Sequence, residues 1–249
     1  CYGDYFDSEA VVQRALSGYF GLVSFMDEQV GKIMNVFDEL GLAANTDVIY
    51  TSDHGDNLGS RGLWGKSTMY EEIAGVPLIC VGQGYAPSSL VETPVSHVDV
   101  FPTLLNVQGE SFESVADGHP GVDLREIAKG QVPERCVLSE YHGMGSRSSA
   151  FMLRVGGYKY VYYGEYQPQL FDLAKDPEEL NDLATNPEYS DVLARCHQQL
   201  TAMLDPQEVD QRARRRQAEL LALHGGREAV IARGDLGFTP APGAASDFR

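Results

Sequence analysis

The segment that decides the fold lies at residues 47–66 and reads DVIYTSDHGDNLGSRGLWGK. Its first five residues are a short β-branched and apolar run, which is typical of a buried strand. The strand ends at the polar residues 52–56, and a glycine-rich loop follows. A second apolar run, VPLICV at 76–81, predicts another buried strand. We therefore expect two strands joined by a polar, glycine-rich loop.

Helices are predicted on both sides of this strand pair. Apolar residues recur in steps of three and four over residues 8–40, as in one long amphipathic helix. Ser8 can cap the start of that helix, and Gly41 can end it. A second helix is expected near 98–107, with Pro102 in its first turn. Helix, strand, loop, strand and helix in this order indicate a layered α/β domain.

The pattern changes after about residue 133. Four short apolar runs with turn signals between them predict a small antiparallel sheet, and Gly156-Gly157 marks a hairpin turn. Helices are expected at 187–204 and 207–224, and the Pro/Gly-rich end at 239–249 is expected to be irregular. We divide the chain into the α/β part at 1–133, the small sheet with its helix at 134–205, and a helical then irregular tail at 206–249.

Composition excludes several classes of function. The 249 residues carry a net charge of −17, which disfavours nucleic acid as the main partner. No stretch approaches the roughly 20 apolar residues of a membrane span, so no membrane partner is expected. The four cysteines form no zinc-binding pattern and no disulfide framework. We therefore expect a cytoplasmic protein, with the periplasm as the alternative because the N-terminus looks incomplete.

The loop after the first strand carries the residues best suited to chemistry. We expect Asp53 and His54 at the carboxyl end of a central parallel strand, where ligands gather in open α/β sheets. A carboxylate and an imidazole can bind one divalent metal, and Lys66 can return a cation to the same cleft. Such a site suits an oxyanion. The alternative is an ordinary turn that closes a strand, with a lysine on the surface.

Several longer motifs resemble the sulfatase family of the alkaline-phosphatase-like superfamily. The similarity runs in order over roughly residues 15–205. Its motifs are TSDHGD at 51–56, GLWGK at 62–66, YEE at 70–72, VPL at 76–78, SHVDVFPTLL at 96–105, residues 118–124, LFDL at 170–173, DP at 176–177 and NDLA at 181–184. The resemblance implies part of the layered alkaline-phosphatase-like sheet, followed by the small antiparallel sheet with its helix. Residues 225–230 are similar to a bacterial subgroup near the choline-sulfatases.

The resemblance also implies roles for individual residues. Asp53 and His54 would bind the metal, and Lys66 would act in catalysis by contacting the sulfate oxygens and the leaving group. Calcium is the expected metal. Many family members carry Asn where His54 stands, and the softer imidazole leaves manganese as an alternative. Arg61 is expected either to select the substrate or to lie on the loop surface.

Two other features have alternative interpretations. His142 lies on a glycine-rich loop after a predicted strand, where it can either touch substrate or remain a solvent-exposed imidazole. The arginines at 212–216 are expected on a solvated helix face or at a contact between copies in a homo-oligomer.

The chain also departs from the family's pattern. The family's nucleophile is a formylglycine made from Cys or Ser in a Cys/Ser-x-Pro/Ala-x-Arg motif, and that motif is absent here. The family's first pair of metal-binding aspartates is absent as well. We therefore expect the C-terminal half of a sulfate-ester hydrolase, inactive by itself. Phosphonate or phosphate ester hydrolysis and a non-catalytic sulfatase-like module are the alternatives.

Overall fold

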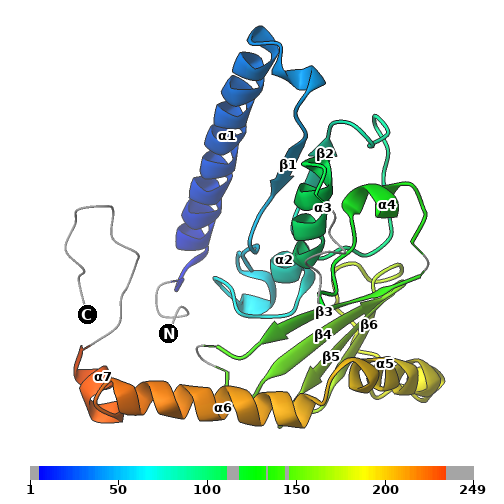
Figure 1. Ribbon diagram of the computed structural model, residues 1–249. Coiled ribbons are helices and arrows are strands. Elements are labelled where there is room, and N and C mark those ends of the chain that lie inside the picture. Colours follow the sequence, from blue (N-terminus) through cyan, green and yellow to red (C-terminus); the bar gives the residue numbers. More distant parts are fainter. Residues whose placement is uncertain (1–5, 111–117, 133, 144–145, 234–249) are drawn as a thin grey trace.

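The computed structural model describes residues 6–110, 118–132, 134–143 and 146–233 (Figure 1). Its helices are α1 (Glu9–Glu39), α2 (Glu71–Ala74), α3 (Val100–Val107), α4 (Leu124–Ala128), α5 (Ser190–Met203), α6 (Pro206–Leu223) and α7 (Arg227–Arg233). Its strands are β1 (Val48–Thr51), β2 (Leu78–Val81), β3 (Cys136–Tyr141), β4 (Ala150–Val155), β5 (Tyr158–Tyr163) and β6 (Gln169–Asp172). Short 3₁₀ helices lie at Leu42–Ala44, Ser60–Gly62, His97–Asp99 and Pro187–Tyr189.

The strands form two separate antiparallel sheets. In the first, β1 pairs with β2, so that Val48 faces Val81 and Thr51 faces Leu78. The expectation that β1 has a parallel neighbour is wrong for the described part of the chain. The reason is the path of the intervening segment. Its only α-helix is the four-residue α2, so no crossover returns the chain to the start of β1, and β2 runs back from the end where β1 stops.

The long N-terminal helix is confirmed, but its apolar side is open. Helix α1 runs beside β1, with β2 on the other side of that strand (Figure 1). None of its residues is buried, and Phe20, Leu22 and Phe25 are each 59–69% exposed. Ser8 occupies the N-cap position without a side-chain hydrogen bond, and Gly41 follows the helix in the left-handed conformation that favours glycine. The described residues therefore leave a wide apolar surface uncovered.

The second sheet has the order β3-β4-β5-β6 and contains most of the core. Because side chains alternate along a strand, β4 and β5 present different residues to the two faces. On one face, Phe151, Leu153 and Tyr160 pack with Cys196 and Leu200 of α5. On the other face, the buried residues are Met69, Ala150, Met152 and Val161. The second face therefore packs against the segment that follows the glycine-rich loop.

The tail begins with α6, which runs along the lower edge of the small sheet in Figure 1. Asp205 caps this helix by accepting hydrogen bonds from the N–H groups of Gln207 and Glu208. Arg214 reaches back to Glu165 and pairs within the helix with Asp210, while Arg212, Arg215 and Arg216 stay exposed. The irregular end expected at 239–249 lies outside the described residues. None of the described helices is long and apolar enough to cross a membrane.

Candidate active site

Three of the predicted residues meet at the end of β1. The Lys66 ammonium lies 2.9 Å from Nε2 of His54, and that same nitrogen lies 3.3 Å from a carboxylate oxygen of Asp53. The other carboxylate oxygen of Asp53 accepts the backbone N–H of His54 at 3.0 Å. The glycine-rich loop thus returns Lys66 to the strand end, as its spacing predicts. The three side chains form one cluster, which we call the DHK cluster.

Hydrogen bonds define which nitrogen of His54 carries the proton. Nδ1 lies 2.8 Å from the backbone oxygen of Gly55. A carbonyl oxygen can only accept, so Nδ1 must be the donor. In the neutral ring, Nε2 then presents its lone pair to the ammonium of Lys66. A backbone carbonyl that orients a histidine in this way is a common support for metal-binding imidazoles.

Charges around Asp53 keep its carboxyl group ionised. Desolvation acts to raise the pKa, but the hydrogen bond from the His54 N–H and the charge of Lys66 are among the interactions that outweigh it. The pKa of Asp53 therefore lies below its usual value. The carboxylate remains largely exposed, at 82% for its side chain, and is open to a cation from solvent.

The loop that carries Lys66 is held by polar side chains at its base. Asp56 accepts the backbone N–H groups of Leu58 and Gly65 at 2.9 and 3.2 Å. Asn57, only 1% exposed, donates to the backbone oxygen of Gly65 and accepts from Thr68. These contacts of Asp56 shape the turn of the loop.

Gly55 is required by the close approach of another segment. A Cβ atom at this position would lie 1.8 Å from the backbone oxygen of Glu72. The N–H of Gly55 also donates to the backbone oxygen of Ile73 at 3.0 Å. The strand end that carries Asp53 and His54 is therefore packed directly on α2.

Arg61 does not join the DHK cluster by any contact that the structure gives. Its guanidinium pairs with Glu72 at 2.7 Å, donates to the backbone oxygen of Glu178, and lies 4.0 Å from the ring centre of Tyr70. The backbone of Arg61 has a φ of 54°, in the left-handed region. These contacts hold the loop against the C-terminal part of the chain, and a role for Arg61 in substrate binding stays a prediction.

His142 has partners of its own on the small sheet. Its Nδ1 lies 2.6 Å from the hydroxyl of Ser149, its Nε2 lies 2.9 Å from Glu140, and its ring packs edge-on against Phe151. Gln217 of α6 donates to its backbone oxygen. The imidazole is therefore anchored rather than a freely exposed loop side chain. Sequence analysis placed the loop correctly but missed Glu140 and Ser149, which lie two and seven residues away.

The described residues offer two ligands for a divalent metal. Among the described residues, no three His, Cys, Asp or Glu side chains gather as a ligand set. Asp53 and His54 nonetheless fit two positions of such a site, because a carboxylate oxygen and the Nε2 lone pair converge on one point. The Lys66 ammonium lies 2.9 Å from this nitrogen, so positive charge already lies beside the His54 lone pair.

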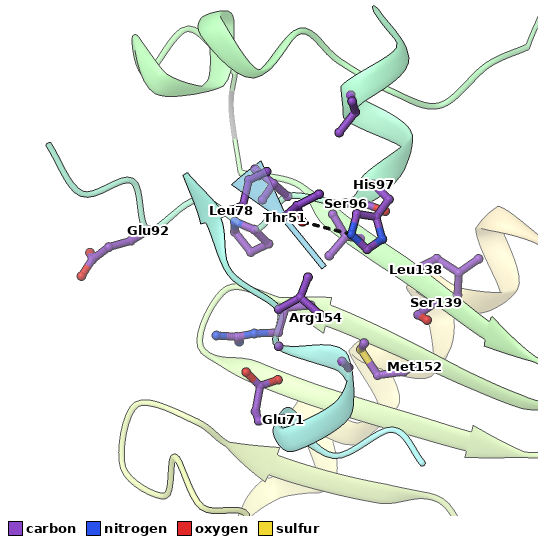
Figure 2. Close-up of a pocket in the computed structure, with 17 residues that line it drawn as sticks. Thr51, Glu71, Leu78, Glu92, Ser96, His97, Leu138, Ser139, Met152 and Arg154 are labelled. Carbon is purple, nitrogen blue, oxygen red and sulfur yellow. Dashed lines mark hydrogen bonds between the residues drawn. The ribbon is translucent and has the colours of Figure 1, made fainter. Parts of the chain in front are cut away.

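A cavity of about 260 Å³ lies between β2, the 3₁₀ helix at His97–Asp99 and the face of the small sheet. In Figure 2, His97 points to Thr51 at the end of β1, and their side chains lie 3.3 Å apart. Glu71 of α2 and Arg154 of β4 line the same cavity from below. At the start of this 3₁₀ helix, Ser96 and Asp99 form a capping box.

Comparisons with known proteins show the family to which the chain belongs. The family model described as Sulfatase matches residues 2–110, and the model described as N-sulphoglucosamine sulphohydrolase, C-terminal, matches residues 59–206. The choline-sulfatase of Rhizobium meliloti (strain 1021) is 41% identical over 180 residues, which are 72% of this chain and 35% of that protein. Arylsulfatase K of Mus musculus is 32% identical over 216 residues, which are 82% of this chain and 38% of that protein.

Solved structures give the same result for the fold. A 2-O GAG sulfatase superposes with a TM-score of 0.71 at 25% identity, covering 85% of this chain and 46% of that one. The phosphonate monoester hydrolase of Agrobacterium radiobacter superposes with a TM-score of 0.63 at 25% identity, covering 74% and 40%. The chain spans little more than a third of the curated relatives described above. On the family models, the chain belongs to the sulfatase family of the alkaline-phosphatase-like superfamily.

Proposed function

We propose that this chain supplies one side of the active site of a sulfate-ester hydrolase. Asp53 and His54 are the metal ligands, and Lys66 contacts the sulfate oxygens and the leaving group. The observation that carries the proposal is that Nε2 of His54 lies 2.9 Å from Lys66 and 3.3 Å from Asp53 at the end of β1, in a chain of the sulfatase family. A cation beside a metal position is a suitable arrangement for a tetrahedral oxyanion.

The residues suit a divalent metal of moderate hardness. Calcium is our first choice and manganese the alternative, because Asp53 offers oxygen and His54 offers a softer nitrogen. A bound metal supplies positive charge that polarises a sulfate oxygen. The chain's own contribution is to keep Asp53 ionised and to hold the His54 ring by its bond to Gly55. His54 would hold the metal through Nε2, and the Lys66 ammonium beside it would contact the sulfate oxygens.

The nucleophile is expected in another part of the full-length protein. A formylglycine needs a Cys or Ser in a specific motif, which this sequence lacks. Cys80 and Cys196 are also unsuited to attack, since burial raises the pKa of their thiols. We therefore propose that the chain is the C-terminal portion of a longer enzyme and is inactive by itself.

Phosphonate or phosphate ester hydrolysis is the second candidate. It is favoured by the structural similarity to the phosphonate monoester hydrolase of Agrobacterium radiobacter. Sulfate, phosphate and phosphonate esters all present tetrahedral anions of similar size to a metal and a lysine. They differ in charge, because a phosphate monoester carries close to two negative charges at neutral pH and a sulfate ester carries one.

A substrate comparison tests the proposal. The full-length protein is assayed with 4-nitrophenyl sulfate, 4-nitrophenyl phosphate and 4-nitrophenyl phenylphosphonate under identical conditions. We expect the highest kcat/KM for the sulfate ester. A higher value for the phosphonate or phosphate would establish the second candidate. No turnover of any ester would support a non-catalytic module instead.

A further inference from the structure

A buried lysine on the small sheet joins this sheet to the segment that follows Lys66. The side chain of Lys159 on β5 is 0% exposed and projects from the sheet face that packs on Met69. Its ammonium donates to the backbone oxygen of Met69 at 2.9 Å and pairs with Glu71 at 2.6 Å and Glu179 at 2.8 Å. Burying a charged group is costly unless partners surround it, so these contacts restrict all three segments.

Glu179 strengthens the same connection from a tight turn. Its side chain is also 0% exposed, and its second carboxylate oxygen accepts the backbone N–H of Glu71 at 2.6 Å. Its backbone has a φ of 52°, in the left-handed region that is uncommon for a residue with a side chain. Asp176 holds this turn by accepting the N–H groups of Leu180 and Asn181.

A second set of contacts fastens the loop on the other side of Lys66. Arg61 lies five residues before Lys66 and reaches the backbone oxygen of Glu178 in the same turn. Met69 lies three residues after Lys66 and is held by Lys159. The segment between Arg61 and Met69 is therefore held at both ends by the C-terminal part of the chain, although more than 85 residues of sequence separate them.

We propose that Lys159 is a positioning residue that fixes the placement of Lys66. This inference rests on the proposed function of Lys66. Lys159 contacts the Met69–Glu71 segment, which begins three residues after Lys66, and acts through the backbone of that segment without touching substrate. Displacement of a catalytic group by about 1 Å can lower turnover by about 100-fold. Loss of the contacts that hold the Lys66 loop should therefore lower kcat.

The test uses Lys159→Met in the full-length protein, with and without Lys66→Ala, and 4-nitrophenyl sulfate as the substrate. Lys159→Met keeps the length of the side chain but leaves Glu179 without its cation. The double variant K159M/E179Q removes both charges and keeps an oxygen for the Glu71 N–H, so it is used if the single variant fails to fold. Lys175→Met is the matched control, because Lys175 is 71% exposed and pairs with Asp172 on the same sheet.

We expect Lys159→Met to lower kcat by about 10- to 100-fold when Lys66 is present and by less than about twofold when Lys66 is already alanine. Equal losses in the two backgrounds would show a general structural effect and would overturn the proposal. An unchanged kcat in the presence of Lys66 would overturn it as well. Thermal unfolding of every variant shows that the protein is folded at the assay temperature.

Hydrogen–deuterium exchange provides a readout that does not depend on activity. Peptides covering residues 57–68 should exchange faster in Lys159→Met than in the wild-type protein, and should be unchanged in Lys175→Met. Equal exchange in all three proteins would overturn the positioning role. If the wild-type protein hydrolyses no sulfate ester, the proposed function fails, and the exchange measurement still decides whether Lys159 holds the loop.

Discussion

Replacing Lys66 with alanine is the most informative change in the proposed mechanism. Lys66 is placed by the glycine-rich loop with its ammonium 2.9 Å from His54, and its charge is felt at Asp53. The substitution removes the cation and shortens the side chain, while the turn contacts of Asp56 and Asn57 remain. The fold should therefore survive, and the loss should appear in the chemical step.

The size of the loss follows from electrostatics. Two unit charges about 4 Å apart interact by about 4 kcal/mol at an effective dielectric of about 20. Removing one group that stabilises a developing oxyanion typically costs about 3–4 kcal/mol, or a factor of about 100 to 1,000 in kcat. Solvent reaches this cluster, since the side chain of Asp53 is 82% exposed, and it weakens the interaction. We therefore expect the lower end, a loss of about 100-fold.

The assay measures kcat and KM of the full-length protein with 4-nitrophenyl sulfate, for the wild type, Lys66→Ala and the control Lys175→Ala. We expect a large fall in kcat for the first variant and no change for the second. Unchanged kcat in a folded Lys66→Ala protein would refute the reasoning and remove Lys66 from the mechanism. A change in KM alone would mean that Lys66 binds substrate and transition state equally.

Three other predictions follow from the structure. Gly55→Ala should lower the midpoint of thermal unfolding, because its Cβ would lie 1.8 Å from the backbone oxygen of Glu72, and a midpoint equal to that of the wild type would contradict this. Desolvation acts to raise the pKa of Asp210, but hydrogen bonds from the Ser149 N–H and from Arg214 hold this pKa below its usual value. The stability it contributes is therefore present above about pH 4 and lost as pH falls through the lowered pKa. Urea unfolding at a series of pH values measures the free energy of unfolding. Below pH ~4 this free energy should fall less steeply for Asp210→Asn than for the wild type, and an identical fall in both proteins would contradict the prediction. Residues 1–249 expressed alone should show no aryl-sulfate hydrolysis and poor solubility, since the α1 face and β2 residues such as Ile79 are open; turnover above a buffer blank would contradict this.

Local patterns predicted much of the fold. The spacing of apolar residues placed α1, α5, α6 and the strands within three residues of their observed bounds, because side-chain periodicity reports directly on burial. It missed α2 and α4, which have four and five residues and are too short to show a helical period. The pairing of β1 was also missed, because it depends on the path of residues 52–77 in space.

The candidate site also has residues that the local sequence predicts and residues whose contacts it does not predict. Asp53, His54 and Lys66 were predictable because one short loop brings them together. The contacts of Arg61 were not predictable, since its partner Glu178 lies 117 residues away in the sequence. The same holds for Lys159, which lies 90 residues after Met69 and reads in the sequence as an ordinary strand residue. Contacts that depend on tertiary packing leave no local pattern.

Metal binding tests the central claim most directly. Calcium is titrated by calorimetry into the full-length protein, its Asp53→Ala and His54→Ala variants, and the control Glu208→Ala on α6. We expect each of the two site variants to weaken calcium binding by more than about 100-fold, because even residues that only support a metal ligand change affinity by about 10- to 100-fold. The control should bind as the wild type does. Equal calcium affinity in all four proteins would contradict the assignment of Asp53 and His54 as metal ligands.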